Sequence, residues 1–270
     1  MSLVRTLVDY INKIRSDHGI QPVKYANSGA SNFRANYMLK ENIFSHYDKE
    51  GVNPVYYFTR AGNYFGMEEA IGYTFSIFPR FKDGVSVVNV SKDLIHQMVY
   101  DDQESNWGHR DTLLNPCANY SDVSVAWDSR RVFLVITMIS AWVNWGVNPS
   151  IRDSVFYAKG RVRVMSPESV IIFQDEPNPS YVSRRYYDLG RPIEGVLPPG
   201  LFFRDLRTIR PYTWKMGEEM ELKFPLQLTG GVYTVVVNAR DSRRVKWKPL
   251  SGRDPELCSI LTFSFKVPQK

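Results

Sequence analysis

Two histidines with acidic residues near them are the side chains of this sequence best suited to chemistry. The 270-residue chain has four histidines in all. His46 ends the tripeptide FSH, and His109 lies in the segment NWGHRDTLLNP at residues 106–116. The carboxylates close to them in sequence are Glu68, Glu69, Asp101, Asp102 and Glu104. Neutral imidazoles and carboxylates bind Zn²⁺ or another divalent cation, and the same groups can act as general acid and base.

A second interpretation of these residues stays open, in which both histidines lie on loops and are hydrogen-bonded to carboxylates. Nothing in the spacing requires His46 and His109 to meet. The other two histidines have simpler expected roles. His18 ends the first helix, where a cation interacts favourably with the helix dipole. His96 lies among the core positions of a helix and is expected to be packed or at the surface.

The first half of the chain predicts helices followed by a hairpin. Apolar residues at helical spacing indicate helices over residues 3–18 and 28–41, and a third over 91–104 that Ser91 would cap. Residues 45–66 are expected to form loop and short helix. The second helix is expected to bury one face, with Ala30, Phe33, Tyr37 and Met38. Two strands follow, over residues 122–127 and 131–140, joined by a turn at 128–130. This order favours an α+β domain.

The second half predicts an all-β sandwich. A stretch rich in Gly, Asn and Pro at residues 144–154 is the best boundary, so we expect one domain at 1–148 and a second at 149–270. Turn residues at 229–231 separate two of the strands. The expected strands are residues 161–165, 169–173, 219–228, 232–238 and 259–267. Short strands between turns are typical of a β-sandwich.

The distribution of charged residues along the chain indicates which kinds of partner to expect. Residues 1–150 carry 14 basic and 15 acidic side chains, whereas residues 151–270 carry 20 and 13, so the whole net charge of +6 comes from the second half. The basic residues are scattered and no stacking motif accompanies them, so a solubilising surface is expected and nucleic acid is not expected as a partner. An acidic polymer could still bind such a surface.

No segment is expected to cross a membrane. The longest mostly apolar stretch, Val132–Val143, is shorter than the roughly 20 residues a spanning helix needs. The N-terminus has no recognisable signal peptide, which leaves open an intracellular protein or a chain whose leader has been removed.

The two cysteines, Cys117 and Cys258, lack the spacing of a zinc site. They can form one bridge between the halves of the chain or remain buried thiols. Of these alternatives, we predict two unbridged thiols.

Four stretches together resemble the CAP superfamily, which includes cysteine-rich secretory proteins, antigen 5 and plant pathogenesis-related proteins. The likeness is greatest to its prokaryotic or archaeal branch and covers about residues 3–145. The four stretches are LVDYINKIRSDHGIQPVKY, NIFSHYDKEGVNP, MEEAIGY and GHRDTLLNP, at residues 7–25, 42–54, 67–73 and 108–116. The resemblance implies a three-layer α-β-α sandwich. The second half more loosely resembles β-sandwich extensions of archaeal CAP proteins, through residues 195–200 and 231–237.

The resemblance also implies a cleft with two histidines and two carboxylates. His46 and His109 match the histidines, which would be the metal ligands. Glu69 matches one carboxylate, and Asp101 is chosen for the other by its spacing to His109. The alternatives are Glu68, which stands where the family has Gly, and Asp102 and Glu104. Zn²⁺ or another divalent cation is the implied cofactor.

As a function, the resemblance implies a secreted or cell-surface binding module without established catalysis. No nucleophile–base pair is recognised, since no serine or cysteine sits in a nucleophile elbow, and no HExxH pair is present. The expected partner is a cell-envelope or extracellular protein or an acidic polysaccharide. Two alternatives remain: a metal-assisted hydrolase of peptide or ester bonds with Glu69 as base, and a structural surface or filament protein with a vestigial cleft.

Overall fold

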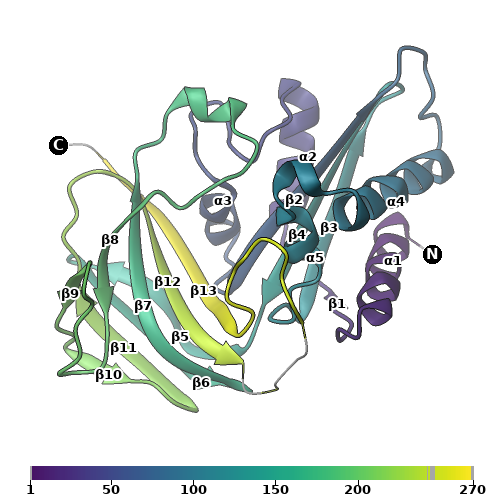
Figure 1. Ribbon diagram of the computed structural model, residues 1–270. Helices are drawn as coiled ribbons and strands as arrows, with labels where there is room; N and C mark the ends of the chain where they lie inside the picture. The colour runs from purple at the N-terminus through teal and green to yellow at the C-terminus, as the bar shows by residue number, and fades with distance from the viewer. Residues whose placement is uncertain (1, 242, 244–246, 269–270) are drawn as a thin grey trace.

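The computed structural model describes residues 2–241, 243 and 247–268, and its first half is a three-layer sandwich (Figure 1). The helices of this half are α1 (Leu3–Asp17), α2 (Ala30–Glu41), α3 (Pro54–Arg60), α4 (Gly84–Tyr100), η1 (Gln103–Ser105) and α5 (Gly108–Leu113). Its strands are β1 (Lys24–Tyr25), β2 (Gly66–Phe75), β3 (Tyr120–Trp127) and β4 (Arg131–Ser140). They form one sheet in the order β1-β3-β4-β2, which leaves β2 at an edge.

Two groups of helices cover the two faces of this sheet. Helices α1 and α4 bury their apolar sides against one face, where Leu7, Ile95 and Ile136 share a core. Helix α2 packs on the opposite face around Met38 and Phe133. The expected three-layer α-β-α arrangement is therefore confirmed, and so is the hairpin between β3 and β4, whose strands pair in antiparallel register.

Helix α4 starts earlier than the sequence pattern indicates. Its N-cap is Asp83, which accepts a hydrogen bond from the backbone N–H of Ser86 at 2.8 Å. Ser91, expected as the cap, is buried inside the helix. The first turns are rich in valine, which has a modest helix propensity, so the pattern marks only the later part of the helix.

Helix α2 buries Ala30 and Met38 as expected, but not Phe33 and Tyr37. Phe33 is 46% exposed and stacks on Tyr57, and Tyr37 is only partly buried. The buried side contains Arg34 instead. A buried carboxylate, Glu69, pairs with this arginine, and hydrophobic periodicity cannot anticipate such a pair.

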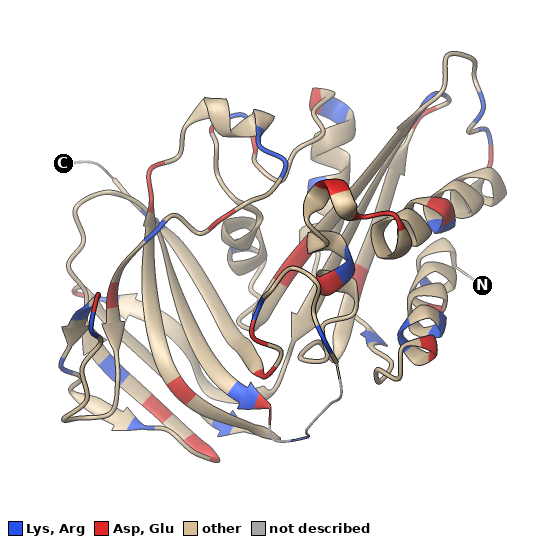
Figure 2. Ribbon diagram, viewed as in Figure 1, with Lys and Arg blue, Asp and Glu red and all other residues tan. Residues whose placement is uncertain are grey.

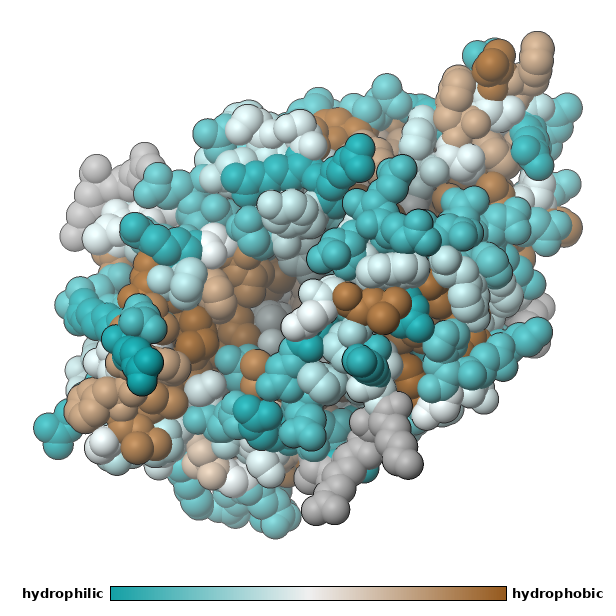
Figure 3. Space-filling model, in the orientation of Figure 1, coloured by the Kyte–Doolittle hydropathy of each residue, from teal (hydrophilic) through white to brown (hydrophobic). Residues whose placement is uncertain are grey.

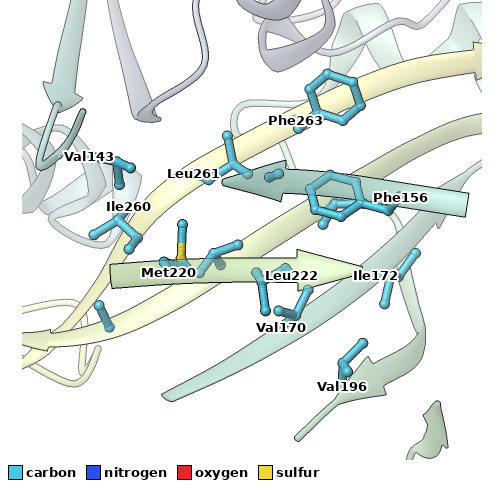
Figure 4. Close-up of a cluster of buried hydrophobic side chains, with 14 of the residues drawn as sticks. Val143, Phe156, Val170, Ile172, Val196, Met220, Leu222, Ile260, Leu261 and Phe263 are labelled. Atoms are coloured by element: carbon cyan, nitrogen blue, oxygen red, sulfur yellow. The ribbon is translucent and has the colours of Figure 1, made fainter. Parts of the chain in front are cut away.

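The second half is a β-sandwich, as expected. Its elements are β5 (Val143–Arg152), β6 (Val155–Val162), β7 (Met165–Asp175), η2 (Pro179–Ser183), β8 (Arg191–Val196), β9 (Arg207–Ile209), β10 (Thr213–Lys215), β11 (Glu219–Pro225), β12 (Gly231–Asp241) and β13 (Leu257–Val267). The two sheets have the orders β10-β11-β6-β5 and β13-β12-β7-β8-β9. Their inner faces meet in one core, where Phe156, Met220 and Phe263 project between the sheets (Figure 4).

Two local expectations in the second half differ from the structure. The predicted strand at 161–165 is wrong, because β6 ends at Val162 and β7 begins at Met165. Val164 between them has a φ of 68°, so the chain turns there. The Gly, Asn and Pro stretch at 144–154 is largely strand β5, which pairs with β6 despite irregular register.

The last strand, β13, returns to the first half and packs against it. The N–H of Thr262 donates to the carbonyl of Phe65 at 3.1 Å. A Cβ on Gly66 would lie 1.7 Å from the carbonyl oxygen of Ser259, so only glycine allows this approach. The two halves are therefore joined by close backbone contact as well as by the chain.

A disulfide bond joins Cys117 to Cys258, so the prediction of two unbridged thiols is wrong. The start of β13 lies beside the segment after α5, which brings the two Cα atoms to 5.6 Å. That separation is typical of disulfides. The sequence could not reveal this pairing, because only the packing of β13 against the first half creates it.

The surface carries mixed charge. On the face shown in Figure 2, Lys and Arg are interspersed with Asp and Glu over both halves. The same face is mostly hydrophilic in Figure 3, with hydrophobic residues over the sandwich and at the tip of the loop between β2 and α4, where Ile77 and Phe78 are 72% and 77% exposed. Among the described residues, no helix combines the length and apolar character needed to span a membrane.

Candidate functional site

His46 is held by a buried carboxylate. It lies in the loop after α2, and its Nδ1 is 3.0 Å from Oε1 of Glu69 on β2. Burial alone would raise the pKa of Glu69, but the charge of Arg34 and the hydrogen bond with His46 outweigh it and hold that pKa below its ordinary value. The ionised carboxylate can only accept a hydrogen bond, so Nδ1 of His46 carries a proton, and in the neutral imidazole Nε2 keeps its lone pair.

Arg34 fixes both members of this pair. Its Nη2 donates to the carbonyls of Ser45 and His46, each at 2.7 Å, and its Nε donates to Glu69 at 3.3 Å. The guanidinium is buried with the carboxylate. Burial lowers the pKa of His46, although the hydrogen bond that its ring donates to Glu69 opposes this, so the imidazole is neutral near pH 7.

The second histidine is held in the same way by Asp102. Nδ1 of His109 lies 2.8 Å from Oδ1 of Asp102. The other carboxylate oxygen accepts from the backbone N–H of Arg110 at 3.0 Å, and the hydroxyl of Ser105 also bonds to Asp102. Burial by itself would raise the pKa of Asp102. These hydrogen bonds outweigh that effect and hold the pKa below its ordinary value, so the group is ionised.

The structure therefore places Asp102, rather than Asp101, against His109. Asp101 is the C-cap of α4 and is exposed. His109 lies in the first turn of α5 rather than on a loop. Asn106 and Trp107 just before it have positive φ values of 52° and 64°, and this turn brings His109 back toward Asp102.

The two imidazoles face each other across a cleft. Their ring centroids are 6.5 Å apart and the planes are inclined by 24°. Each ring uses Nδ1 for its carboxylate, so each has Nε2 available. A carboxylate behind an imidazole in this manner orients the ring and raises its basicity toward a metal ion.

The second half of the chain forms part of the same cleft. Tyr187, from the segment between η2 and β8, packs against His46 with ring centroids 4.9 Å apart. Its hydroxyl accepts a hydrogen bond from the N–H of Glu69 at 3.1 Å. Burial raises the pKa of Tyr187 far above its ordinary value, so this tyrosine stays protonated.

The other candidate carboxylates have different partners. Glu68 pairs with Arg253, whose Nη1 lies 3.1 Å from Oε2, and it also accepts from Asn115. Glu104 is exposed and lies 3.6 Å from Arg185. Both basic partners come from the second half, so these carboxylates form ion pairs between the two halves at the rim of the cleft.

A cavity of about 600 Å³ opens beside the histidines. His46, Asp102 and His109 line one part of it. A smaller cavity of about 250 Å³ lies on the other side, between the histidines and Arg253. The larger volume is typical of a ligand site.

The Nε2 atoms of His46 and His109 could bind a cation through two protein nitrogens. Within the residues that the structure describes, no group of three or more His, Cys, Asp or Glu side chains is placed to hold a metal ion. The carboxylates face Nδ1, so a cation at the Nε2 atoms would take its other ligands from water or from a partner.

Sequence patterns did not identify three residues of this site: Arg34, Tyr187 and Arg253. Arg34 carried one usable signal, since an arginine four residues from both Ala30 and Met38 lies on their side of the helix. Tyr187 and Arg253 carried none, because they reach the cleft through the packing of the second half.

One known protein family matches most of the first half of the chain. Residues 8–139 match the family described as CAP, the cysteine-rich secretory protein family. No curated protein matches the chain. Among solved structures, the chain is similar to the CAP domain of Enterococcal PrgA, with 16% sequence identity and a TM-score of 0.35, over 50% of this chain and 59% of that one. The first half of this protein is a CAP domain, so the chain belongs to the CAP superfamily, with a β-rich region added after that domain.

Proposed function

We propose that this protein is an extracellular or cell-surface binding module whose cleft holds a divalent cation, such as Zn²⁺, between His46 and His109. The observation that carries the proposal is the pair of facing imidazoles, each with Nδ1 bonded to an ionised carboxylate. Neutral imidazole is a good ligand for Zn²⁺, and a site with open positions leaves room for water or an oxygen of a partner.

The disulfide supports the proposed location. Disulfide bonds persist in oxidising compartments and are rare where thiols are kept reduced. Cys117 and Cys258 are bridged, which agrees with a secreted or surface protein. The proposed partner is a cell-envelope or extracellular protein, or an acidic polysaccharide at the basic second half.

The arrangement favours binding over hydrolysis. A hydrolase would need Glu69 as a base that reaches a bound water. One oxygen of Glu69 is bonded to His46 and the other to Arg34, so this carboxylate is engaged in positioning His46.

Calorimetric titration of metal-stripped protein with ZnCl₂ tests the proposal. We expect saturable one-to-one binding that His109→Ala abolishes, and likewise His46→Ala if it folds. His96→Ala is the matched control, because His96 is exposed on α4 and does not line the cleft. Absence of zinc binding, or equal binding by His109→Ala and the unaltered protein, would contradict the proposal.

A further inference from the structure

The edge of strand β2 next to the histidines has free backbone groups. β2 pairs with β4 on one side and lies at the edge of its sheet. In an antiparallel strand the N–H and C=O of one residue point to the same side, and this side alternates along the chain. The N–H of Glu69 points away from β4, since it bonds to Tyr187, so Ile71 and Tyr73 also direct their backbone groups outward.

The second half of the chain covers only the first part of this edge. The carbonyl of Phe65 accepts from Thr262, and the N–H of Glu69 donates to Tyr187. Beyond Glu69, no hydrogen bond among the described residues reaches the outward N–H or C=O of Ile71 or Tyr73. Buried or half-buried backbone groups without partners are uncommon, so these four groups need water or a ligand.

The 600 Å³ cavity lies along this uncovered part of the edge. Ile71 and Gly72 of β2 line it. One wall comes from the loop after α2, with Phe44 and Ser45, and another from α4. The lining residues of α4 are Leu94, Gln97 and Met98, together with its C-cap, Asp101. The remaining wall is the segment 182–185, whose Arg184 and Arg185 face the same cavity as Asp101 and Glu104.

We infer that this groove binds an extended peptide segment of a partner protein, which adds to the sheet as a strand beside β2. This peptide would be the partner bound by the cleft of the proposed function, on which the inference rests. His46 and His109 line the same groove. Main-chain hydrogen bonds give affinity in this mode of recognition, and pockets for alternate side chains give specificity. The apolar surfaces of Phe44 and Leu94 would receive such side chains on either side of the added strand.

A peptide is favoured over a sugar or a lipid by the pattern of groups in the groove. The uncovered edge presents N–H and C=O groups in a row with the period of a β-strand. That pattern matches another backbone. The charges at the rim are of both signs, with Asp101 and Glu104 near Arg184 and Arg185, which suits a polypeptide of mixed composition better than a uniformly acidic chain.

The first experiment measures binding of a positional-scanning library of acetylated, amidated octapeptides, in EDTA and again with zinc. The best peptide is then resynthesised with single N-methyl groups along its backbone. We expect that N-methylation at either of two alternate residues, i and i+2, will weaken binding at least 10-fold. Methylation of the residue between them, i+1, should have little effect. Equal effects at all positions, or no octapeptide bound in either buffer, would overturn the inference.

Protein variants test the location. Gln97→Trp should fill the groove and weaken the peptide at least 10-fold, because Gln97 is exposed and lines the cavity. Asn89→Trp, exposed on the same helix and outside the cavity, is the control. Hydrogen exchange at the amides of Ile71 and Tyr73 should slow when the peptide binds. Equal binding by both variants, or unchanged exchange, would refute this location.

These outcomes are separate from those of the zinc titration. Zinc binding that is lost in His109→Ala while no peptide binds would uphold the cation site and overturn the peptide groove. Peptide binding in EDTA with the alternating N-methyl pattern would uphold the groove even if zinc does not bind.

Discussion

Asp102 accepts a hydrogen bond from Nδ1 of His109 at 2.8 Å, whereas the adjacent Asp101 caps α4 without bonding to that ring. The two aspartates differ by one position in the chain and occupy different environments, one buried and one exposed. Only Asp102 can orient the imidazole. This pair of neighbours therefore gives a direct test of how the cleft is organised.

We predict that Asp102→Ala weakens zinc binding by about 10- to 100-fold, the usual effect of removing a partner behind a metal-binding histidine. Asp101→Ala should leave the affinity unchanged. Calorimetry on the two metal-stripped variants makes the comparison. Equal affinities in the two variants would contradict the role given to Asp102.

Glu69→Gln should destabilise the protein strongly. It leaves the buried guanidinium of Arg34 without its counter-charge, and breaking a buried ion pair costs about 3–5 kcal/mol. Glu68→Gln is the matched control, because Glu68 pairs with Arg253 in a partly exposed position, where about 1 kcal/mol or less is expected. Urea unfolding measures both, and a larger loss for Glu68→Gln would show that the buried pair is misassigned.

Removal of the disulfide should lower the free energy of unfolding by about 2–5 kcal/mol, because the bond closes a long loop in the unfolded chain. The loop spans 141 residues. Thermal or urea unfolding of the Cys117→Ala/Cys258→Ala variant measures the loss. As a check of the bond itself, a thiol-alkylating reagent should label the unfolded protein only after reduction. Two labels without reductant would disprove the bridge.

Asp175 should make stability depend on pH. Burial, with the nearby charge of Asp188, raises the pKa of Asp175 to about 6. A raised carboxyl pKa stabilises the folded state below the ordinary pKa, and this contribution is lost as the pH rises through about 6. Asp175→Asn should therefore be more stable than the unaltered protein at pH 8, by about 1–3 kcal/mol, with little difference at pH 3.5.

Urea unfolding at these two pH values measures the effect of Asp175→Asn. Glu176→Gln is the control, since Glu176 is the adjacent exposed carboxylate. A stabilisation of Asp175→Asn that is as large at pH 3.5 as at pH 8 would show that its charge is not the cause.

Hydrophobic periodicity predicted the type and approximate position of most helices and strands. It did not predict where some of them begin, or which charged side chains are buried. Helix α1 and the β3–β4 hairpin match their predicted positions closely, because their burial follows a simple period. The start of α4 was missed because a valine-rich stretch precedes the clear pattern. The buried face of α2 was only partly predicted because Arg34 is buried with a partner from a different strand.

The sequence by itself determined the class of the fold and the CAP resemblance, and through that resemblance it singled out the two histidines and Glu69 as candidates, since these depend on local patterns and recognisable segments. Tertiary structure alone decided which aspartate holds His109, that Cys117 meets Cys258, and that Tyr187 and Arg253 line the cleft. The aspartate is decided by the turn at Asn106 and Trp107, which brings His109 back toward Asp102. The disulfide and the positions of Tyr187 and Arg253 depend on where β13 and the loops of the second half pack against the first. Such contacts join residues far apart in the chain, and no local pattern encodes their distance.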